Sequence, residues 1–123
     1  MNYGKTIVCG SRTITDYKVV ESYLDHIIND LDLIPTHIIS GCAKGIDTLA
    51  IRYAHEKGIP TIEVPAKWDL YGKSAGFKRN KEMLEIANAV IALWDGKSKG
   101  TENTIELAHE KGIPAAVFII KQK

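Results

Sequence analysis

The chain has 123 residues, of which 45% are hydrophobic and 25% charged, and its formal net charge is +1 at pH 7. This composition is typical of one soluble globular domain over residues 1–123, and no apolar stretch approaches the roughly 20 residues that span a bilayer, so no membrane partner is expected. The small net charge argues against nucleic-acid binding through a strongly basic surface.

Strand-like and helix-like patterns alternate along the chain. A short apolar run ends at the turn Gly10-Ser11-Arg12, Asp16 follows as a helix cap, and apolar residues with helical spacing run to Leu31. In chain order we expect strand 6–9, helix 17–31, strand 37–39, helix 46–57, strand 61–64, a polar and aromatic loop at 67–74, helix 75–87, strand 90–93, helix 101–111 and strand 115–120.

This alternation, with short connections, favours an α/β fold with a parallel sheet and helices on both faces. Because crossovers are right-handed, we expect a Rossmann-like, doubly wound sheet of five strands in the order 3-2-1-4-5. Strand 61–64 alternates polar and apolar residues, which suggests an edge position. The loops after strands 1, 2 and 4 then converge on the crevice between the carboxyl ends of strands 1 and 4, where open α/β sheets bind ligands.

The segment Ser40–Asp47 joins the second strand to the second helix and contains two glycines. Glycines let the backbone expose its N–H groups, and the helix N-terminus adds a positive dipole end, so this turn suits a phosphate or another anion. The pattern G-x-x-K-G occurs at 41–45 and again at 96–100, which predicts two similar loops beside one crevice. A second repeat, Ala-His-Glu-Lys-Gly-Ile-Pro at 54–60 and 108–114, is explained by helix C-capping.

Basic residues gather in or beside the loops expected at this edge of the sheet. Nine of the sixteen fall there: Arg12, Lys44, Lys67, Lys73, Lys78, Arg79, Lys81, Lys97 and Lys99. This favours an anionic small molecule over a polymer. Cys9 and Cys42 are the only cysteines, and neither they nor the four histidines have metal-ligand spacing. We therefore expect reduced thiols, no metal and no cofactor, and the absence of signal-peptide features predicts a cytoplasmic protein.

The candidate ligand-binding residues come from these loops and from the start of the third long helix. They are Gly10, Ser11, Arg12, Ser40, Gly41, Lys44, Gly45, Asp47, Trp68, Arg79, Asn80, Gly100 and Thr101. The planar guanidinium groups of the two arginines suit phosphate or carboxylate. Asn80 falls on the buried stripe of its helix, where its amide either braces the backbone of residues 10–12 or contacts the ligand. Trp68 either stacks on a base or covers the core, and Thr101 either caps the last helix or binds phosphate.

Several segments together resemble the SLOG superfamily, a Rossmann-like group that includes DprA and the LOG phosphoribohydrolases. They are residues 7–12, Ser40–Asp47, residues 79–83 and Gly100-Thr101. The resemblance is closest to the small YspA/YpsA-related branch, in which Trp68, the Tyr71-Gly72-Lys73 turn, Ala75-Gly76 and Arg79-Asn80 look like the central signature. It implies one SLOG-like domain that binds a nucleotide or nucleotide-derived ligand at the carboxyl edge of the sheet, as a sensor or a processing domain.

Two alternatives follow from the same resemblance. A LOG-like protein would be an N-glycosidase acting on a nucleoside monophosphate, but Thr104 stands at the position of the family's catalytic glutamate, so Glu102 or Glu106 would have to be the acid/base. A DprA-like protein would bind single-stranded nucleic acid, for which the low net charge is unfavourable. A protein-interaction module, which does not depend on the resemblance, is kept beside this second alternative. Relatives of this kind often pair through helices, which implies a homodimer.

Overall fold

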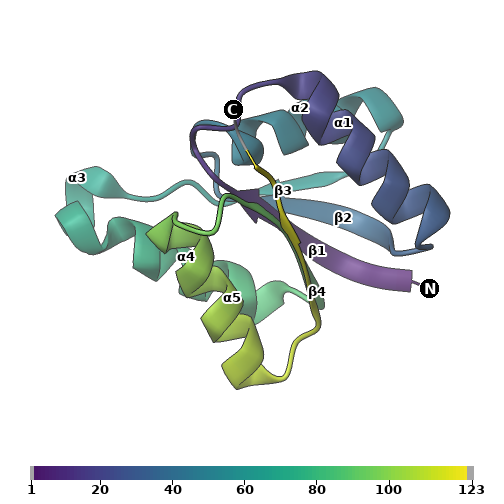
Figure 1. Cartoon of the computed structure of the whole chain (residues 1–123). Coiled ribbons are helices and arrows are strands. Elements are labelled where there is room, and N and C mark those ends of the chain that lie inside the picture. The colour runs from purple at the N-terminus through teal and green to yellow at the C-terminus, as the bar shows by residue number, and fades with distance from the viewer. Residues whose placement is uncertain (1, 122–123) are drawn as a thin grey trace.

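The computed structural model describes residues 2–121, in which five parallel strands form one sheet in the order β3-β2-β1-β4-β5 (Figure 1). The strands are β1 (Asn2–Gly10), β2 (Ile34–Ser40), β3 (Thr61–Glu63), β4 (Ala89–Trp94) and β5 (Ala115–Ile119). This confirms the predicted α/β class and strand order, and β3 lies at an edge, as its polar alternation indicated.

Helices cover both faces of the sheet, with α1 and α2 on one side and α4 and α5 on the other (Figure 1). The helical segments are α1 (Tyr17–Asp25), a π-helical turn η1 (His26–Asp30), α2 (Ile46–Lys57), α3 (Trp68–Tyr71), a 3₁₀ turn η2 (Gly72–Ser74), α4 (Ala75–Ile86) and α5 (Lys99–Lys111). Neighbouring residues Ile7 and Val8 are both fully buried, one in each of the two cores. Burial on both faces explains why the central strands are continuous apolar runs in the sequence.

Two segments differ from the elements that the sequence predicts. The helix expected to continue to Leu31 changes into the π-helical turn η1 at His26. The expected loop at 67–74 contains α3 and η2, which are too short for their apolar residues to show a helical period. Among residues 2–121, none of the helices has the length and apolar character that crossing a membrane requires.

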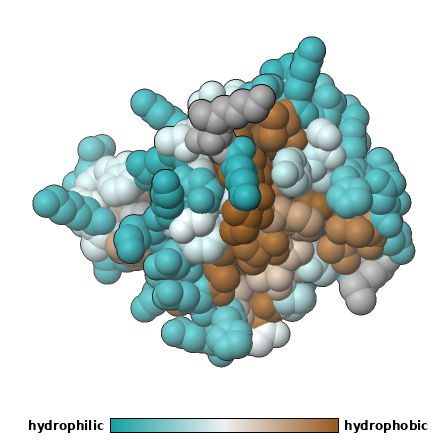
Figure 2. Space-filling view, viewed as in Figure 1, coloured by the Kyte–Doolittle hydropathy of each residue, from teal (hydrophilic) through white to brown (hydrophobic). Residues whose placement is uncertain are grey.

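The edge strand β5 keeps part of its apolar surface exposed. The exposed fractions of Val117 and Ile119 are 39% and 52%. Figure 2 shows a hydrophobic band over this strand, whereas hydrophilic side chains dominate the region of α3, α4 and α5 beside it. The helices therefore do not fully cover this edge of the sheet.

The repeated heptapeptide forms the same helix cap twice. Gly58 and Gly112 both follow the last residue of a helix, and both have a φ of 70°. The next residue closes the cap in each case, with Ile59 N donating to Ala54 O at 2.8 Å and Ile113 N donating to Ala108 O at 2.9 Å. The C-capping explanation of this repeat agrees with the structure.

The two G-x-x-K-G segments, by contrast, are not structurally equivalent. Gly45 precedes α2 with a φ of 79°, and Ile46 N donates to Ser11 O at 3.4 Å. Gly100 instead lies inside the first turn of α5, which begins at Lys99. The prediction of two similar loops was wrong, because the second helix starts two residues earlier relative to the pattern, at Lys99 rather than after the last glycine.

Replacing Gly45 by alanine should destabilise the protein more than the same change at Gly58. Gly58 has the left-handed αL conformation, with φ 70° and ψ 27°, where alanine costs roughly 1 kcal/mol. Gly45, with φ 79° and ψ −130°, lies outside that region, so its backbone cost is at least as large. A Cβ at Gly45 would also lie 2.5 Å from Ser11 O, whereas no atom lies within 4 Å of a Cβ at Gly58. We expect urea unfolding to show an additional loss of about 1–3 kcal/mol for Gly45→Ala. Equal losses would mean that the contact between the two loops relaxes without cost.

Candidate functional site

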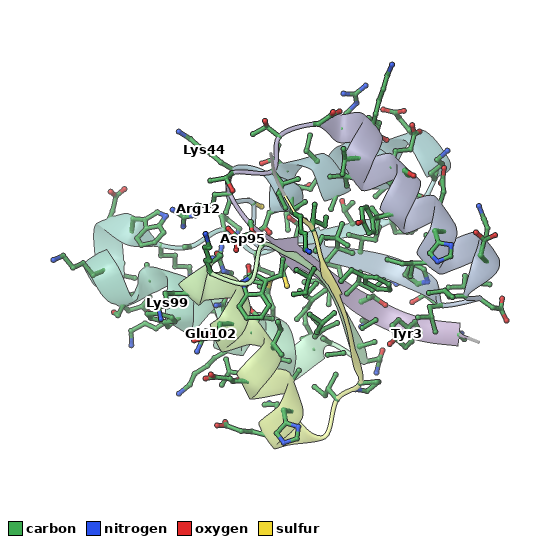
Figure 3. All side chains as sticks on the ribbon, viewed as in Figure 1. Tyr3, Arg12, Lys44, Asp95, Lys99 and Glu102 are labelled. Carbon is green, nitrogen blue, oxygen red and sulfur yellow. The ribbon has the colours of Figure 1, made fainter. Side chains whose placement is uncertain are left out.

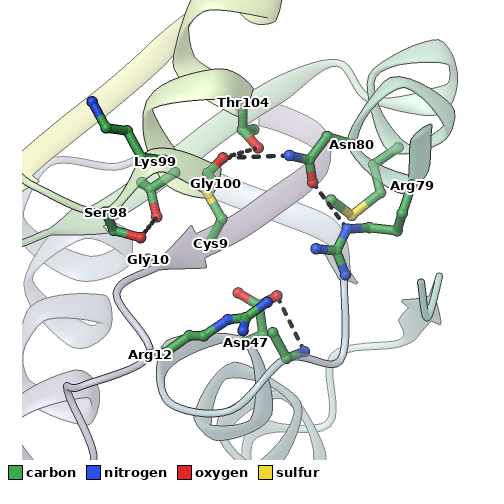
Figure 4. A pocket seen from close by; sticks show the side chains of 13 residues that line it. Cys9, Gly10, Arg12, Asp47, Arg79, Asn80, Ser98, Lys99, Gly100 and Thr104 are labelled. Carbon is green, nitrogen blue, oxygen red and sulfur yellow. Dashed lines mark hydrogen bonds between the residues drawn. The ribbon is translucent and has the colours of Figure 1, made fainter. Parts of the chain in front are cut away.

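Three adjoining cavities open at the carboxyl ends of β1, β2 and β4, with volumes of about 260, 450 and 180 Å³. Arg12 and Arg79 line all three, so the cavities form one branched groove around this pair. We call the first the central cavity; it lies between the loop after β1, the start of α2, α4 and the start of α5 (Figure 4). The other two, the outer cavities, border Trp68.

Positive charge dominates this groove. Among the described residues that line it, five are basic, namely Arg12, Lys44, Lys73, Arg79 and Lys99, and one is acidic, namely Asp47. Figure 3 shows Arg12, Lys44 and Lys99 toward the same edge of the sheet, whereas Tyr3 lies near the opposite end. The groove therefore has a positive local potential although the net charge of the chain is only +1.

The first turn of α5 forms one wall of the central cavity. Lys99, Gly100 and Thr101 line this wall, together with Ser98, the residue before the helix. The first amides of an α-helix have no acceptor within the helix, and they carry the positive end of its dipole. An anion in the central cavity therefore meets N–H donors on this side.

Ser98 and Thr104 line the central cavity but are absent from the candidates that the sequence yields. Both residues have a sequence feature that could have identified them. A serine just before a helix is a common N-cap, and Thr104 follows Thr101 by one helical turn, so the two threonines share a face. Thr101 is not the cap, because α5 already begins at Lys99.

Ser11 has a structural role at the edge of the cavity. Its side chain is 1% exposed and does not line any of the three cavities. Ser11 N donates to Leu93 O at 3.2 Å, and its Oγ accepts from Asp95 N at 2.9 Å. Asp95 Oδ1 in turn accepts from Ser98 N at 2.9 Å, which fixes the turn before α5. These bonds hold the loops after β1 and β4 together, as the predicted convergence of the loops requires.

The segment Ser40–Asp47 supplies a carboxylate where the sequence suggests phosphate-binding amides. Ser40 Oγ accepts from Cys42 N at 3.1 Å and donates to Asp47 O at 2.8 Å. Asp47 Oδ2 accepts from Ala43 N at 3.4 Å. Two of the amides of the turn therefore already have acceptors within the turn.

The candidate residues of this turn differ in their access to the groove. Ser40 and Gly45 line none of the three cavities, whereas Gly41 and Lys44 line one of the outer cavities.

Asp47 is the only carboxylate among the described residues that line the groove, and its side chain is 6% exposed. Burial raises its pKa to about 6, and this shift remains although Arg79, the Ala43 amide and Arg12 each act to lower the pKa. Desolvation thus exceeds the stabilisation that the neighbouring cations give to the charged form.

Arg79 and Asn80, both on α4, connect the turn after β2 with α5 through hydrogen bonds of their side chains (Figure 4). Arg79 donates from Nη1 to Gly41 O and from Nε to Asn80 Oδ1, the latter at 2.9 Å. Asn80 Nδ2 donates to Asn103 Oδ1 at 2.9 Å and to Gly100 O at 3.3 Å. Asn80 is thus a buried brace, but its partners lie on α4 and α5 and not on residues 10–12 as expected.

Glu102 and Glu106 do not reach the groove. Both lie on α5, yet neither lines any of the three cavities, and Glu106 is exposed. The inward stripe of this helix is formed by Thr101, Thr104 and Ala108. The acid/base role considered for the glutamates therefore gains no support from their positions.

The sequence comparisons give one family match and one similar protein. The family described as YspA, cpYpsA-related SLOG matches residues 5–71. The gene 61 protein of Mycobacterium phage D29 is 32% identical over 122 residues, which cover 93% of this chain and 95% of that protein. The chain belongs to the YspA, cpYpsA-related SLOG family. The resemblance inferred from the motifs is confirmed.

A solved structure extends the likeness of this SLOG protein to DNA processing protein A (DprA) from Streptococcus pneumoniae. The TM-score is 0.70 at 27% sequence identity, and the match covers 98% of the present chain. It covers only 51% of the DprA chain, so the SLOG chain described here spans about half the length of that protein.

Removing the Asp47 charge should stabilise the SLOG domain increasingly as the pH rises. Because the pKa of Asp47 is raised in the folded state to about 6, its contribution to stability is fully present below its ordinary pKa of 3.8 and is lost as the pH rises through 6. The unfolding free energy of Asp47→Asn relative to wild type should therefore rise between pH 4 and 7, by up to about 3 kcal/mol. Urea unfolding at several pH values measures this difference. Glu106→Gln, at an exposed site, is the matched control, and a pH-independent difference for Asp47→Asn would contradict the assignment.

Proposed function

We propose that this protein binds an anionic, nucleotide-like ligand at the carboxyl edge of its sheet, as a sensor or processing domain. The central cavity carries the proposal, because Arg12 and the first turn of α5 line it from different walls. Membership of the SLOG family and the likeness to a DNA-processing protein support a nucleotide-related or DNA-processing function.

A phosphate group fits the donors of the central cavity. Arg12 is exposed on one wall, and the amides at the start of α5 and the Thr101 hydroxyl lie on another. Arg79 donates from Nε and Nη1 to acceptors within the protein. Its Nη2 has no hydrogen bond among residues 2–121, so this nitrogen can donate to a ligand. Charge-assisted hydrogen bonds of this kind are shorter and stronger than neutral ones.

The outer cavities suit the base of a nucleotide. Trp68 borders both of them and is 49% exposed, so about half of its surface is accessible. Phe77 borders one of the two and is also 49% exposed. An aromatic base adjoining the central cavity can stack on such a ring while its phosphate stays near Arg12. Glycosidic cleavage by Glu102 or Glu106 is not part of the proposal, because neither residue reaches the groove.

Replacing Arg12 by alanine should weaken nucleotide binding about 10- to 100-fold with little change in the thermal midpoint, because its side chain is exposed. Arg79→Ala should lose both affinity and stability, since Gly41 O and Asn80 Oδ1 would lose their donor. Calorimetric titration with a panel of nucleoside mono-, di- and triphosphates measures the affinities. Arg52→Ala, an exposed arginine paired with Glu56 on α2, is the matched control.

Two results would contradict the proposal in different ways. If no nucleotide in the panel binds or raises the thermal midpoint, nucleotide binding at this groove is wrong. If a nucleotide binds and Arg12→Ala keeps the wild-type affinity, the ligand lies elsewhere.

Single-stranded nucleic acid is the second candidate ligand, because the similar DprA structure is named for DNA processing and five basic residues line the groove. Fluorescence anisotropy with a labelled oligothymidine would show a complex that weakens steeply as salt rises. Absence of a complex at low salt would remove this candidate.

A further inference from the structure

Asp47 occupies the same cavity as the proposed anion site. Its carboxylate and Arg12 lie on one wall of the central cavity, with the start of α5 on another (Figure 4). An anionic ligand would therefore bring a second negative charge into a cavity that already contains a buried carboxylate. Two like charges in such a place each raise the pKa of the other.

The charge of Asp47 is only weakly compensated. Among residues 2–121, no ion pair within 4.0 Å joins it to an arginine or a lysine, and its hydrogen bond from Ala43 N is long, at 3.4 Å. Arg79, the cation that lowers the pKa of Asp47 most, already donates to Gly41 O and Asn80 Oδ1. Protonation of this carboxylate therefore breaks no ion pair.

The charged and titratable groups around Asp47 come from several elements. Arg79 belongs to α4, Arg12 to the loop after β1, Cys9 to β1 and Cys42 to the turn before α2. The two arginines favour the ionised carboxylate, whereas burial disfavours it and raises its pKa to about 6. Burial also raises the pKa of both thiols, so they stay protonated at neutral pH.

We infer that Asp47 takes up a proton when an anionic ligand enters the central cavity, so that the site binds its ligand more tightly at mildly acidic than at alkaline pH. The inference rests on the proposed anion site and adds a control of that site by pH. The proton goes to Oδ1, which leaves the bond from Ala43 N to Oδ2 in place. The protonated oxygen becomes a hydrogen-bond donor at the wall of the central cavity.

The histidines do not offer a competing origin for such a pH dependence. His26, His37, His55 and His109 line none of the three cavities. A probe whose own charge changed with pH would also give a pH-dependent affinity, so the probes must have a constant charge over the range of the experiment. We choose ADP-ribose, whose pyrophosphate is esterified at both ends and has a constant charge in this range, and inorganic sulfate.

Calorimetric titration of the full chain with each probe, in two buffers of different ionisation enthalpy, measures the protons taken up. At pH 7 we expect uptake approaching one proton per bound ADP-ribose, and affinity that falls by up to about tenfold per pH unit above pH 6. Asp47→Asn should abolish the uptake, flatten the pH dependence and bind more tightly than wild type at pH 7.5. Glu63→Gln, an exposed carboxylate beside the groove, should behave as wild type.

The outcomes separate this inference from the proposed function. Binding of either probe without proton uptake and with equal affinity at pH 6 and 8 would overturn the inference and leave the anion site standing. A pH dependence that survives in Asp47→Asn would overturn it as well. If neither probe binds at any pH, the proposed site and the inference both fail. The wild-type uptake decides the question even if the variant does not fold.

Discussion

The hydrogen bonds of Arg79 and Asn80 are the constraint on which the candidate site depends. Two consecutive residues of α4 reach in opposite directions, Arg79 to Gly41 O on the turn after β2 and Asn80 to Gly100 O and Asn103 on α5. The bond between their own side chains joins the two sets. Because one of the partners is a buried guanidinium, each lost bond would leave a desolvated charge or carbonyl. The walls of the groove are therefore held in a fixed relation before any ligand binds.

A second set of contacts fixes the loops on the other side. Ser11 bonds both to Leu93 O and to Asp95 N, so the turn after β1 is joined to the turn after β4. Gly45 lies against the same backbone, where only a residue without a Cβ fits. The glycines and serines of this edge thus shape the cavity by close backbone contact, and the cationic side chains line the space that remains.

The fold was predictable because its signals are local. Buried strands are apolar on both faces, and the heptapeptide repeat encodes two identical caps. The partners in the site depend on packing between distant elements, so the sequence identified Asn80 as a buried amide but not Asn103 as its partner.

The sequence could have excluded Glu102 and Glu106 from the site. The helical spacing of Thr101, Thr104 and Ala108 places these three residues on the inner face of α5, and neither glutamate belongs to this stripe. The motif containing Asp47 pointed to the right turn, but its amides proved to be engaged by the turn's own oxygens.

This last difference changes what the turn contributes. A turn whose free amides cradled phosphate would add positive potential to the groove at every pH. A turn that buries Asp47 instead places a titratable negative charge among five cations. Solvation would favour moving that carboxylate to the surface, so retaining it costs stability at neutral pH. If the groove binds an anion as we propose, its affinity should depend on the proton of Asp47, because burial raises the pKa of this carboxylate to about 6.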